Sequence, residues 1–212
     1  MVYPCYCSRA RRLAASAPHL GDGRRTYDGR CRRLSEAERK KLEAAGRRPA
    51  WRVQVPEREI SFTDGHYGSV TEQLAEETGD LILRRSDGVY AYQLAVTADD
   101  GAMGITRVVR GRDLLSSTPG QLWLMEELGY PEPSYIHLPL LAARGRKLSK
   151  RDGDLNMETL RGRFTPRELT GLLAYLAGLI SSPVSVSPGE LIAGFSWDKV
   201  PRDDIVLPPE LI

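Results

Sequence analysis

An alternation of strand-like and helix-like segments in the middle of the chain most constrains the fold. Residues 104–111 read GITRVVRG, a β-rich run that closes on glycine. Residues 118–129 read TPGQLWLMEELG and carry a cap, an early proline and a terminal glycine, which together predict a helix. Residues 135–141 read YIHLPLL, a short apolar run typical of a buried parallel strand. Strand, helix and strand in this order predict an α/β fold.

The flanking segments carry equally local signals. Residues 51–55, WRVQV, alternate apolar and polar side chains, as a half-buried strand does. Residues 81–96 contain two β-rich runs around Ser-Asp-Gly, which predicts a hairpin. Ser35 and Glu38 have the spacing of a capping box and predict a short exposed helix over 35–46.

The C-terminal part of the chain has helical patterns. Thr165 with Glu168, and Ser187 with Glu190, each combine a cap, a proline and an acidic residue at capping-box spacing. The longest apolar run, residues 169–180, is shorter than a bilayer span and predicts a buried helix. We therefore expect a small helical unit at this end and no membrane role.

Basic residues gather at the N-terminal end. Residues 1–50 contain thirteen Lys and Arg residues and five acidic ones, whereas the rest contains seventeen and twenty-three. A basic region of this kind attracts phosphates, and nucleic acid is a suitable partner. The alternative is a solvated arginine-rich surface, which charge alone favours.

The chain has three cysteines, Cys5, Cys7 and Cys31. An odd number excludes complete pairing as internal disulfides. The first ten residues lack a signal-peptide pattern, so we expect a cytoplasmic protein with reduced thiols. Two thiolates one residue apart and a third further on suit zinc, and the fourth ligand would be His19 by usual chemistry or, less conventionally, Tyr27. Unligated cysteines, packed as small hydrophobic residues, are the alternative.

Two lysines flank a serine in residues 144–154, RGRKLSKRDGD. Lys147, Ser149 and Lys150 follow a strand-like run and precede the helical part, where a phosphate-binding loop lies at the carboxyl end of a parallel sheet. The chain has no G-x-x-x-x-G-K-[ST] sequence, so this is not a Walker loop. Taken in isolation, the stretch is better interpreted as a solvated loop.

These motifs together resemble a known enzyme family. The stretch 147–151, KLSKR, resembles the KMSKS loop of class I aminoacyl-tRNA synthetases. Residues 88–129 are similar to the glutamyl-tRNA synthetase catalytic core, with Y-x-L-A-V, D-D, G-I-T and V-R-G-x-D-L in the same order. The N-terminal C-x-C and Y-x-x-x-C resemble the zinc site of glutamyl-Q tRNA(Asp) synthetases. The resemblance is strong over residues 1–151 and weak beyond.

The resemblance implies an incomplete class I synthetase Rossmann-like catalytic domain, with a zinc-binding insertion and a small C-terminal α-helical unit. The parts would be a zinc-binding segment over 1–50, the C-terminal part of the catalytic domain with the lysine loop over 51–151, and a helical stem-contact unit over 152–212. In the subfamily the tyrosine is a metal ligand, so the expected zinc ligands are Cys5, Cys7, Tyr27 and Cys31, in place of His19.

The implied activity is activation of L-glutamate by ATP, with Mg²⁺ and without tRNA, followed by transfer of glutamate to the queuosine base of the tRNA(Asp) anticodon. Lys147, Ser149 and Lys150 would act on the phosphates, with Lys150 contacting ATP. Tyr92 and Arg110 match glutamate-binding positions of the family. We expect a monomer.

The H-x-G-H signature of class I synthetases is absent from the sequence. Residues 66–69, HYGS, imitate it but follow the cysteine segment, so we predict a loop there. The family's signature, first strand and first helix would all precede Met1, which predicts a chain incomplete for activity. The alternatives are a fragment of an ordinary glutamyl-tRNA synthetase or a non-catalytic, zinc-stabilised RNA-binding remnant.

Overall fold

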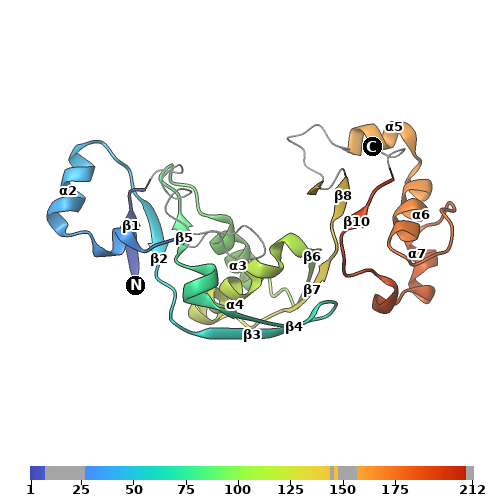
Figure 1. Ribbon diagram of the computed structural model, residues 1–212, viewed down its shortest axis with the longest axis horizontal. Coiled ribbons are helices and arrows are strands. Elements are labelled where there is room, and N and C mark those ends of the chain that lie inside the picture. The colour runs from blue at the N-terminus through green and yellow to red at the C-terminus, as the bar shows by residue number, and fades with distance from the viewer. Residues whose placement is uncertain (8–26, 144–145, 148–156, 209–212) are drawn as a thin grey trace. The chain divides into compact units, whose positions relative to one another are not determined.

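The computed structural model describes residues 1–7, 27–143, 146–147 and 157–208 (Figure 1). The chain forms two compact units, the first made of Met1–Val108 with Leu114–Ile136 and the second of Val109–Asp113 with His137–Ile212. The three parts expected from the sequence, residues 1–50, 51–151 and 152–212, do not coincide with these two units. That division stays a prediction. No helix of the described residues is both long and apolar enough to cross a membrane.

An antiparallel sheet lies at the N-terminal end of the first unit. Its strands are β1 (Val2–Cys5), β2 (Ala50–Val53) and β5 (Leu81–Arg84), in the order β1-β2-β5. The strand predicted over 51–55 is thereby confirmed, with a slightly different range. The exposed helix α2 (Glu36–Ala44) lies in the segment between β1 and β2, and its predicted Ser35–Glu38 capping box is present.

The hairpin predicted over 81–96 is only half right. The first run forms β5, and Tyr90 makes one isolated bridge to Arg84. The second run instead begins α3 (Tyr92–Ala102). Gln, Leu and Ala favour helix as much as the neighbouring Val and Tyr favour strand, and α3 packs against both β5 and the helix α4 (Thr118–Leu128). Tertiary packing therefore decides the conformation of this segment.

A second hairpin, absent from the predicted elements, joins β3 (Glu59–Asp64) to β4 (Gly68–Gln73). Its turn contains His66 and Tyr67, whose backbone N–H groups donate to Asp64 Oδ1 at 3.0 and 2.9 Å. The loop predicted at HYGS is thus largely confirmed, although Gly68 and Ser69 already belong to β4.

The core of the first unit forms around α4, whose residues 118–125 are all buried. This helix begins at Thr118 with Ser117 as its N-cap, and it ends at Gly129, whose φ of 73° suits glycine. Three core residues, Leu122, Trp123 and Leu124, belong to α4. The others come from the segment after β2, from β3, from the turn η2 (Leu74–Thr78) and from β7 (Ser134–Leu138), and they are Val55, Ile60, Leu74 and Tyr135.

The apolar run predicted as one strand over 135–141 is divided in two. The strand β7 (Ser134–Leu138) pairs with β6 (Arg107–Gly111), and β8 (Leu141–Ala143) starts afresh. Pro139 lies at the break, where its missing N–H prevents continued pairing. The predicted strand over 104–111 is confirmed as β6.

The described residues of the second unit form a small sheet and three helices. Strand β8 lies between β10 (Ile205–Val206), which is parallel to it, and β9 (Arg146–Lys147), which is antiparallel. The helices are α5 (Met157–Arg163), α6 (Pro166–Leu176) and α7 (Pro188–Leu191), and both predicted capping boxes are present. Besides η2, the described residues contain the short helical turns η1 (Arg30–Arg33), η3 (Arg112–Ser117), η5 (Ile192–Gly194) and η6 (Trp197–Lys199).

The expected helix over 169–180 is present as α6, but the expectation that it is buried is wrong. Helix α6 ends at Leu176, and only Gly171 and Ala174 within it are buried. Leu173 and Tyr175 are 42% and 44% exposed. The helix is amphipathic rather than apolar on all sides, so it covers the unit with one face only.

Candidate metal centre

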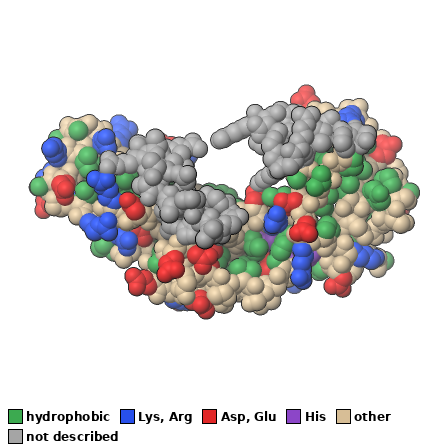
Figure 2. All heavy atoms as spheres, viewed as in Figure 1, with side chains coloured by type: hydrophobic (Ala, Val, Ile, Leu, Met, Phe, Trp, Pro, Cys, Tyr) green, Lys and Arg blue, Asp and Glu red, His purple; other side chains and the backbone are tan. Residues whose placement is uncertain are grey.

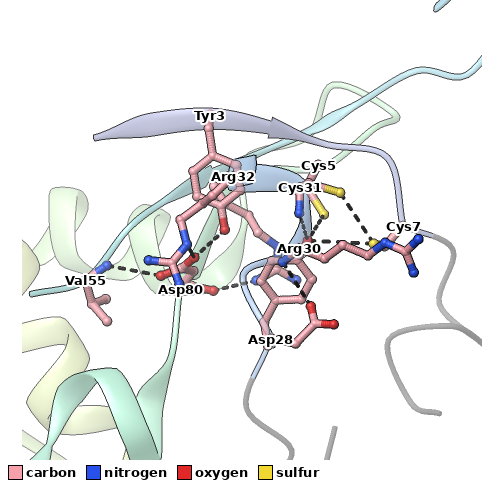
Figure 3. A network of polar contacts seen from close by, with 11 residues as sticks. Tyr3, Cys5, Cys7, Asp28, Arg30, Cys31, Arg32, Val55 and Asp80 are labelled. Atoms are coloured by element: carbon pink, nitrogen blue, oxygen red, sulfur yellow. Dashed lines mark hydrogen bonds and ion pairs between the residues drawn. The ribbon is translucent and has the colours of Figure 1, made fainter. Parts of the chain in front are cut away.

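The end of β1 brings the three cysteines together. Cys5 is the last residue of β1, Cys7 follows it, and η1 packs against β1 and carries Cys31 (Figure 3). All three Sγ atoms lie within 4.8 Å of one another, and Cys7 Sγ is 3.5 Å from Cys31 Sγ. Cys5 and Cys31 are buried, and all three are free thiols.

Tyr27, which the resemblance implies as the fourth ligand, lies beside this cluster. Its Oη lies 3.6 Å from Cys5 Sγ and 3.7 Å from Cys7 Sγ. The same oxygen accepts the backbone N–H of Cys31 at 2.9 Å. His19, the alternative fourth ligand, lies outside the described residues.

Three of the separations among these four atoms fit a tetrahedral zinc ion. Zinc binds thiolate sulfur at about 2.3 Å and oxygen at about 2.0 Å, so neighbouring ligand atoms in a tetrahedron are roughly 3.5 to 3.8 Å apart. Three of the observed separations, at 3.5, 3.6 and 3.7 Å, match that range. The Cys5, Cys7, Tyr27 and Cys31 cluster is therefore suited to hold a metal.

The thiols have unequal electrostatic surroundings. Burial raises the pKa of the Cys5 thiol, but the backbone N–H of Cys7, the Tyr27 hydroxyl and Arg52 outweigh it, so the pKa is lowered. Burial, with contact to Cys31, raises the pKa of Cys7 to about 11 despite the Tyr27 hydroxyl. Burial also raises the pKa of Tyr27. A bound cation would favour the deprotonated form of every ligand.

Arg52 adds positive charge beside the cluster. Its guanidinium carbon lies 4.1 Å from the centre of the Tyr27 ring, and one of its terminal nitrogens donates to the Asp80 carbonyl. The side chain is buried, whereas Trp51 is 41% exposed. The alternation in WRVQV predicted a buried Trp51 and an exposed Arg52. That prediction is wrong because a pattern of apolar residues does not reveal the polar and aromatic partners that Arg52 has inside the unit.

Asp80 ties together the elements that carry the cluster. Its carboxylate accepts the Tyr3 hydroxyl of β1 and the Val55 N–H (3.4 Å), and it forms an ion pair with Arg32 Nε of η1 at 3.2 Å (Figure 3). Burial and the hydrogen bond to Asp80 raise the pKa of the Tyr3 hydroxyl, so the hydroxyl keeps its proton and donates a hydrogen bond to the carboxylate. Tyr3 and Asp80 are both nearly fully buried, so the network holds β1 and η1 in place. No sequence motif pointed to Asp80.

The predicted glutamate-binding residues lie in different units. Tyr92 is the first residue of α3 in the first unit and is 54% exposed. Arg110 belongs to β6 in the second unit, where its Nε donates to His137 Nε2 at 3.0 Å. His137 is fully buried, so this bond limits how the guanidinium of Arg110 turns. Sequence patterns gave no sign of this histidine's role.

The lysine loop is described only at its start. Lys147 is the last residue of β9 and is paired through its backbone with Ala142 of β8. Ser149 and Lys150 lie outside the described residues.

Comparison with known proteins identifies the class of this protein. The sequence pattern of tRNA synthetases class I (E and Q), catalytic domain, matches residues 2–184. This match places the chain among the class I aminoacyl-tRNA synthetases, and the chain belongs to the glutamate and glutamine (E and Q) family of these catalytic domains.

Two proteins of known family and one solved structure are similar to this chain over nearly its whole length. The glutamyl-Q tRNA(Asp) synthetases of Symbiobacterium thermophilum and Nitratidesulfovibrio vulgaris are each 46% identical over all of this chain. The chain spans 66% of the length of either. The crystal structure of glutamate-tRNA synthetase from Elizabethkingia anophelis matches 99% of this chain with a TM-score of 0.70 and 26% identity, over 48% of its own length.

Proposed function

We propose that the chain carries the metal-, glutamate- and phosphate-binding parts of an enzyme that activates L-glutamate with ATP, without tRNA, and transfers it to the queuosine base of tRNA(Asp). The observation that carries this proposal is the four-atom cluster of Cys5, Cys7, Tyr27 and Cys31. Its C-x-C and Y-x-x-x-C pattern resembles the subfamily zinc site, and its atoms have metal-site spacing. The 46% identity to two glutamyl-Q tRNA(Asp) synthetases supports the same assignment.

Activation needs stabilisation of charge more than proton transfer. The glutamate carboxylate is ionised at neutral pH, so it attacks the α-phosphorus of ATP without a general base while pyrophosphate leaves. Lys147 and Lys150 are flexible cations suited to the phosphates, with Ser149 adding a hydrogen bond, and Mg²⁺ would accompany ATP. Lys150 is assigned the contact with ATP.

Arg110 and Tyr92 are assigned to glutamate. A guanidinium binds a carboxylate through two parallel N–H bonds, and the Arg110 Nε bond to the buried His137 restricts the orientation of this guanidinium. The exposed hydroxyl-bearing ring of Tyr92 would add a donor.

The metal has a structural part in this proposal. A zinc ion held by Cys5, Cys7, Tyr27 and Cys31 would cross-link β1, the residues after it and η1, and closed four-ligand sites of this kind contribute folding energy. The enzyme would act in the cytoplasm, since ATP and tRNA are cytoplasmic substrates. It would be a monomer, and its C-terminal helices would form the stem-contact unit.

Transfer of labelled glutamate tests the proposal. The chain, joined to the H-x-G-H segment of one of its relatives, is given ATP, glutamate and either queuosine-containing tRNA(Asp) or tRNA(Glu). We expect label only on tRNA(Asp), removed by mild alkali. Label on tRNA(Glu) would instead favour an ordinary glutamyl-tRNA synthetase, which the 26% identical solved structure keeps as the second candidate.

A further inference from the structure

An arginine-lined hollow lies beside the metal centre in the first unit. Its volume is about 420 Å³. The guanidinium groups that line it come from Arg47, Arg48, Arg52 and Arg85, and Asp87 is the one acidic residue among the lining side chains that the structure describes. Figure 2 shows Lys and Arg side chains gathered over the end of this unit that carries α2. The lining therefore has an excess of positive charge.

The floor of this hollow holds a donor without a partner. Arg52 is 5% exposed, and its Nε forms no hydrogen bond within the described part of the chain. An unsatisfied buried donor costs roughly 1–3 kcal/mol, so the guanidinium of Arg52 keeps an uncompensated positive charge at the lining of the hollow. An anion that enters the hollow would be attracted by that charge.

The rim differs from the floor. Arg47, Arg48 and Arg85 are exposed at the surface, where Arg47 donates to the Tyr6 carbonyl at 3.4 Å and Arg85 pairs with Asp87 at 2.5 Å. A phosphate within a strand needs donors on one side only, because the strand continues into solvent on either side.

We propose that this hollow binds a phosphodiester group of the RNA substrate's backbone, with Arg52 below it and the guanidinium groups of Arg48 and Arg85 beside it. The inference deepens the proposed function, because it takes from that function only that the substrate is RNA. It assigns a role to part of the basic N-terminal region. From charge alone, that region was better interpreted as a solvated surface. The hollow contacts backbone, so it binds RNA without reading sequence.

Matched pairs of substitutions test this proposal in the metal-loaded 212-residue chain. Arg48→Gln with Arg85→Gln removes two charges from the hollow, one of them ion-paired. Arg107→Gln with Arg58→Gln removes two exposed charges elsewhere in the same unit, and Arg58 is likewise ion-paired, with Glu126 at 2.8 Å. All four arginines are exposed, and zinc content and circular dichroism verify that each variant folds.

Fluorescence anisotropy measures binding of a labelled RNA hairpin with the tRNA(Asp) anticodon-loop sequence, and of an unrelated hairpin of equal length, over a range of salt concentrations. For both RNAs we expect the hollow pair to weaken binding roughly tenfold and to reduce the slope of log K against log salt by about one to two, with little effect of the control pair. Equal losses in both pairs would show that net charge alone binds RNA. No loss in the hollow pair, or no binding by the unsubstituted chain, would also overturn the proposal.

Two further measurements separate the possible failures. Inorganic phosphate, exchanged for chloride at constant ionic strength, should not displace the RNA; displacement would mean that the hollow takes free phosphate instead. Glutamate-dependent pyrophosphate exchange, measured without RNA on the H-x-G-H-joined chain, should be unchanged in the hollow pair. Loss of exchange and transfer in the unsubstituted protein would refute the proposed function but not the mapped RNA contact.

Discussion

Replacing Tyr27 with phenylalanine separates a metal ligand from a structural tyrosine. The ring, which lies 4.1 Å beneath the Arg52 guanidinium carbon, is retained, and only the oxygen is removed. That oxygen has two roles in the structure, as acceptor of the Cys31 N–H at 2.9 Å and as neighbour of the Cys5 and Cys7 sulfurs at 3.6 and 3.7 Å. The two roles predict losses of different size.

If Tyr27 only positions Cys31, the substitution removes one hydrogen bond. Such a bond contributes about 1 kcal/mol, which corresponds to about a fivefold change in an equilibrium constant. Loss of a residue that only hydrogen-bonds to a metal ligand typically lowers metal affinity by about 10- to 100-fold. If the phenol oxygen is itself a ligand, its removal should lower zinc affinity by more than that. We therefore expect Tyr27→Phe to bind zinc at least about 100-fold more weakly than the unsubstituted chain.

Competition with a chromophoric chelator measures this affinity, and X-ray absorption at the zinc edge counts ligands, with three sulfurs and one oxygen expected. Tyr6→Phe is the matched control, because the Tyr6 hydroxyl is bonded to Glu43 Oε1 at 2.5 Å and its removal leaves the four-atom cluster intact. Zinc affinity of Tyr27→Phe within about fivefold of the unsubstituted chain would refute the ligand assignment.

Other substitutions test the remaining assignments. Lys150→Ala should lower glutamate-dependent pyrophosphate exchange roughly 100-fold, about 3 kcal/mol in the transition state, with zinc content and circular dichroism unchanged. Gly171→Ala should lower the urea midpoint of the second unit, because a Cβ would lie 1.7 Å from the Val184 carbonyl oxygen, whereas Gly162→Ala meets no atom within 4 Å and should not. The Ser187 cap lowers the pKa of Glu190 to about 2, so its contribution is complete above the ordinary pKa near 4.5 and is lost as pH falls toward 2. Glu190→Gln should accordingly flatten the pH dependence of unfolding, followed by circular dichroism, between those limits.

Structure that depends on neighbours in sequence was predictable. The capping boxes that begin α2, α6 and α7 join side chains three residues apart, so the sequence contains all the partners. The same holds for the glycine after α4, where the required conformation is a property of one residue. These signals located four helix ends without knowledge of the fold.

Structure that depends on distant partners was not predictable. The segment that starts at Tyr92 became helical because α4 packs against it, and Arg52 turned inward because Asp80 and Tyr27 lie there. Neither partner is near in sequence. Cysteine spacing alone left the metal site and its fourth ligand open, and resemblance favoured Tyr27 over His19. The structure places the Tyr27 hydroxyl beside the Cys5 and Cys7 thiols.

The metal centre and the arginine-lined hollow share Cys5, Cys7 and Arg52 among their lining residues. Each thiol that loses its proton to a metal puts negative charge beside the same guanidinium that would meet a phosphate, while the cation offsets part of that charge. Metal loading therefore changes the potential of the hollow as well as the fold around it. A loss of RNA binding on chelation would not by itself identify the RNA contact, whereas a loss on substitution of Arg48 and Arg85 with zinc still bound would.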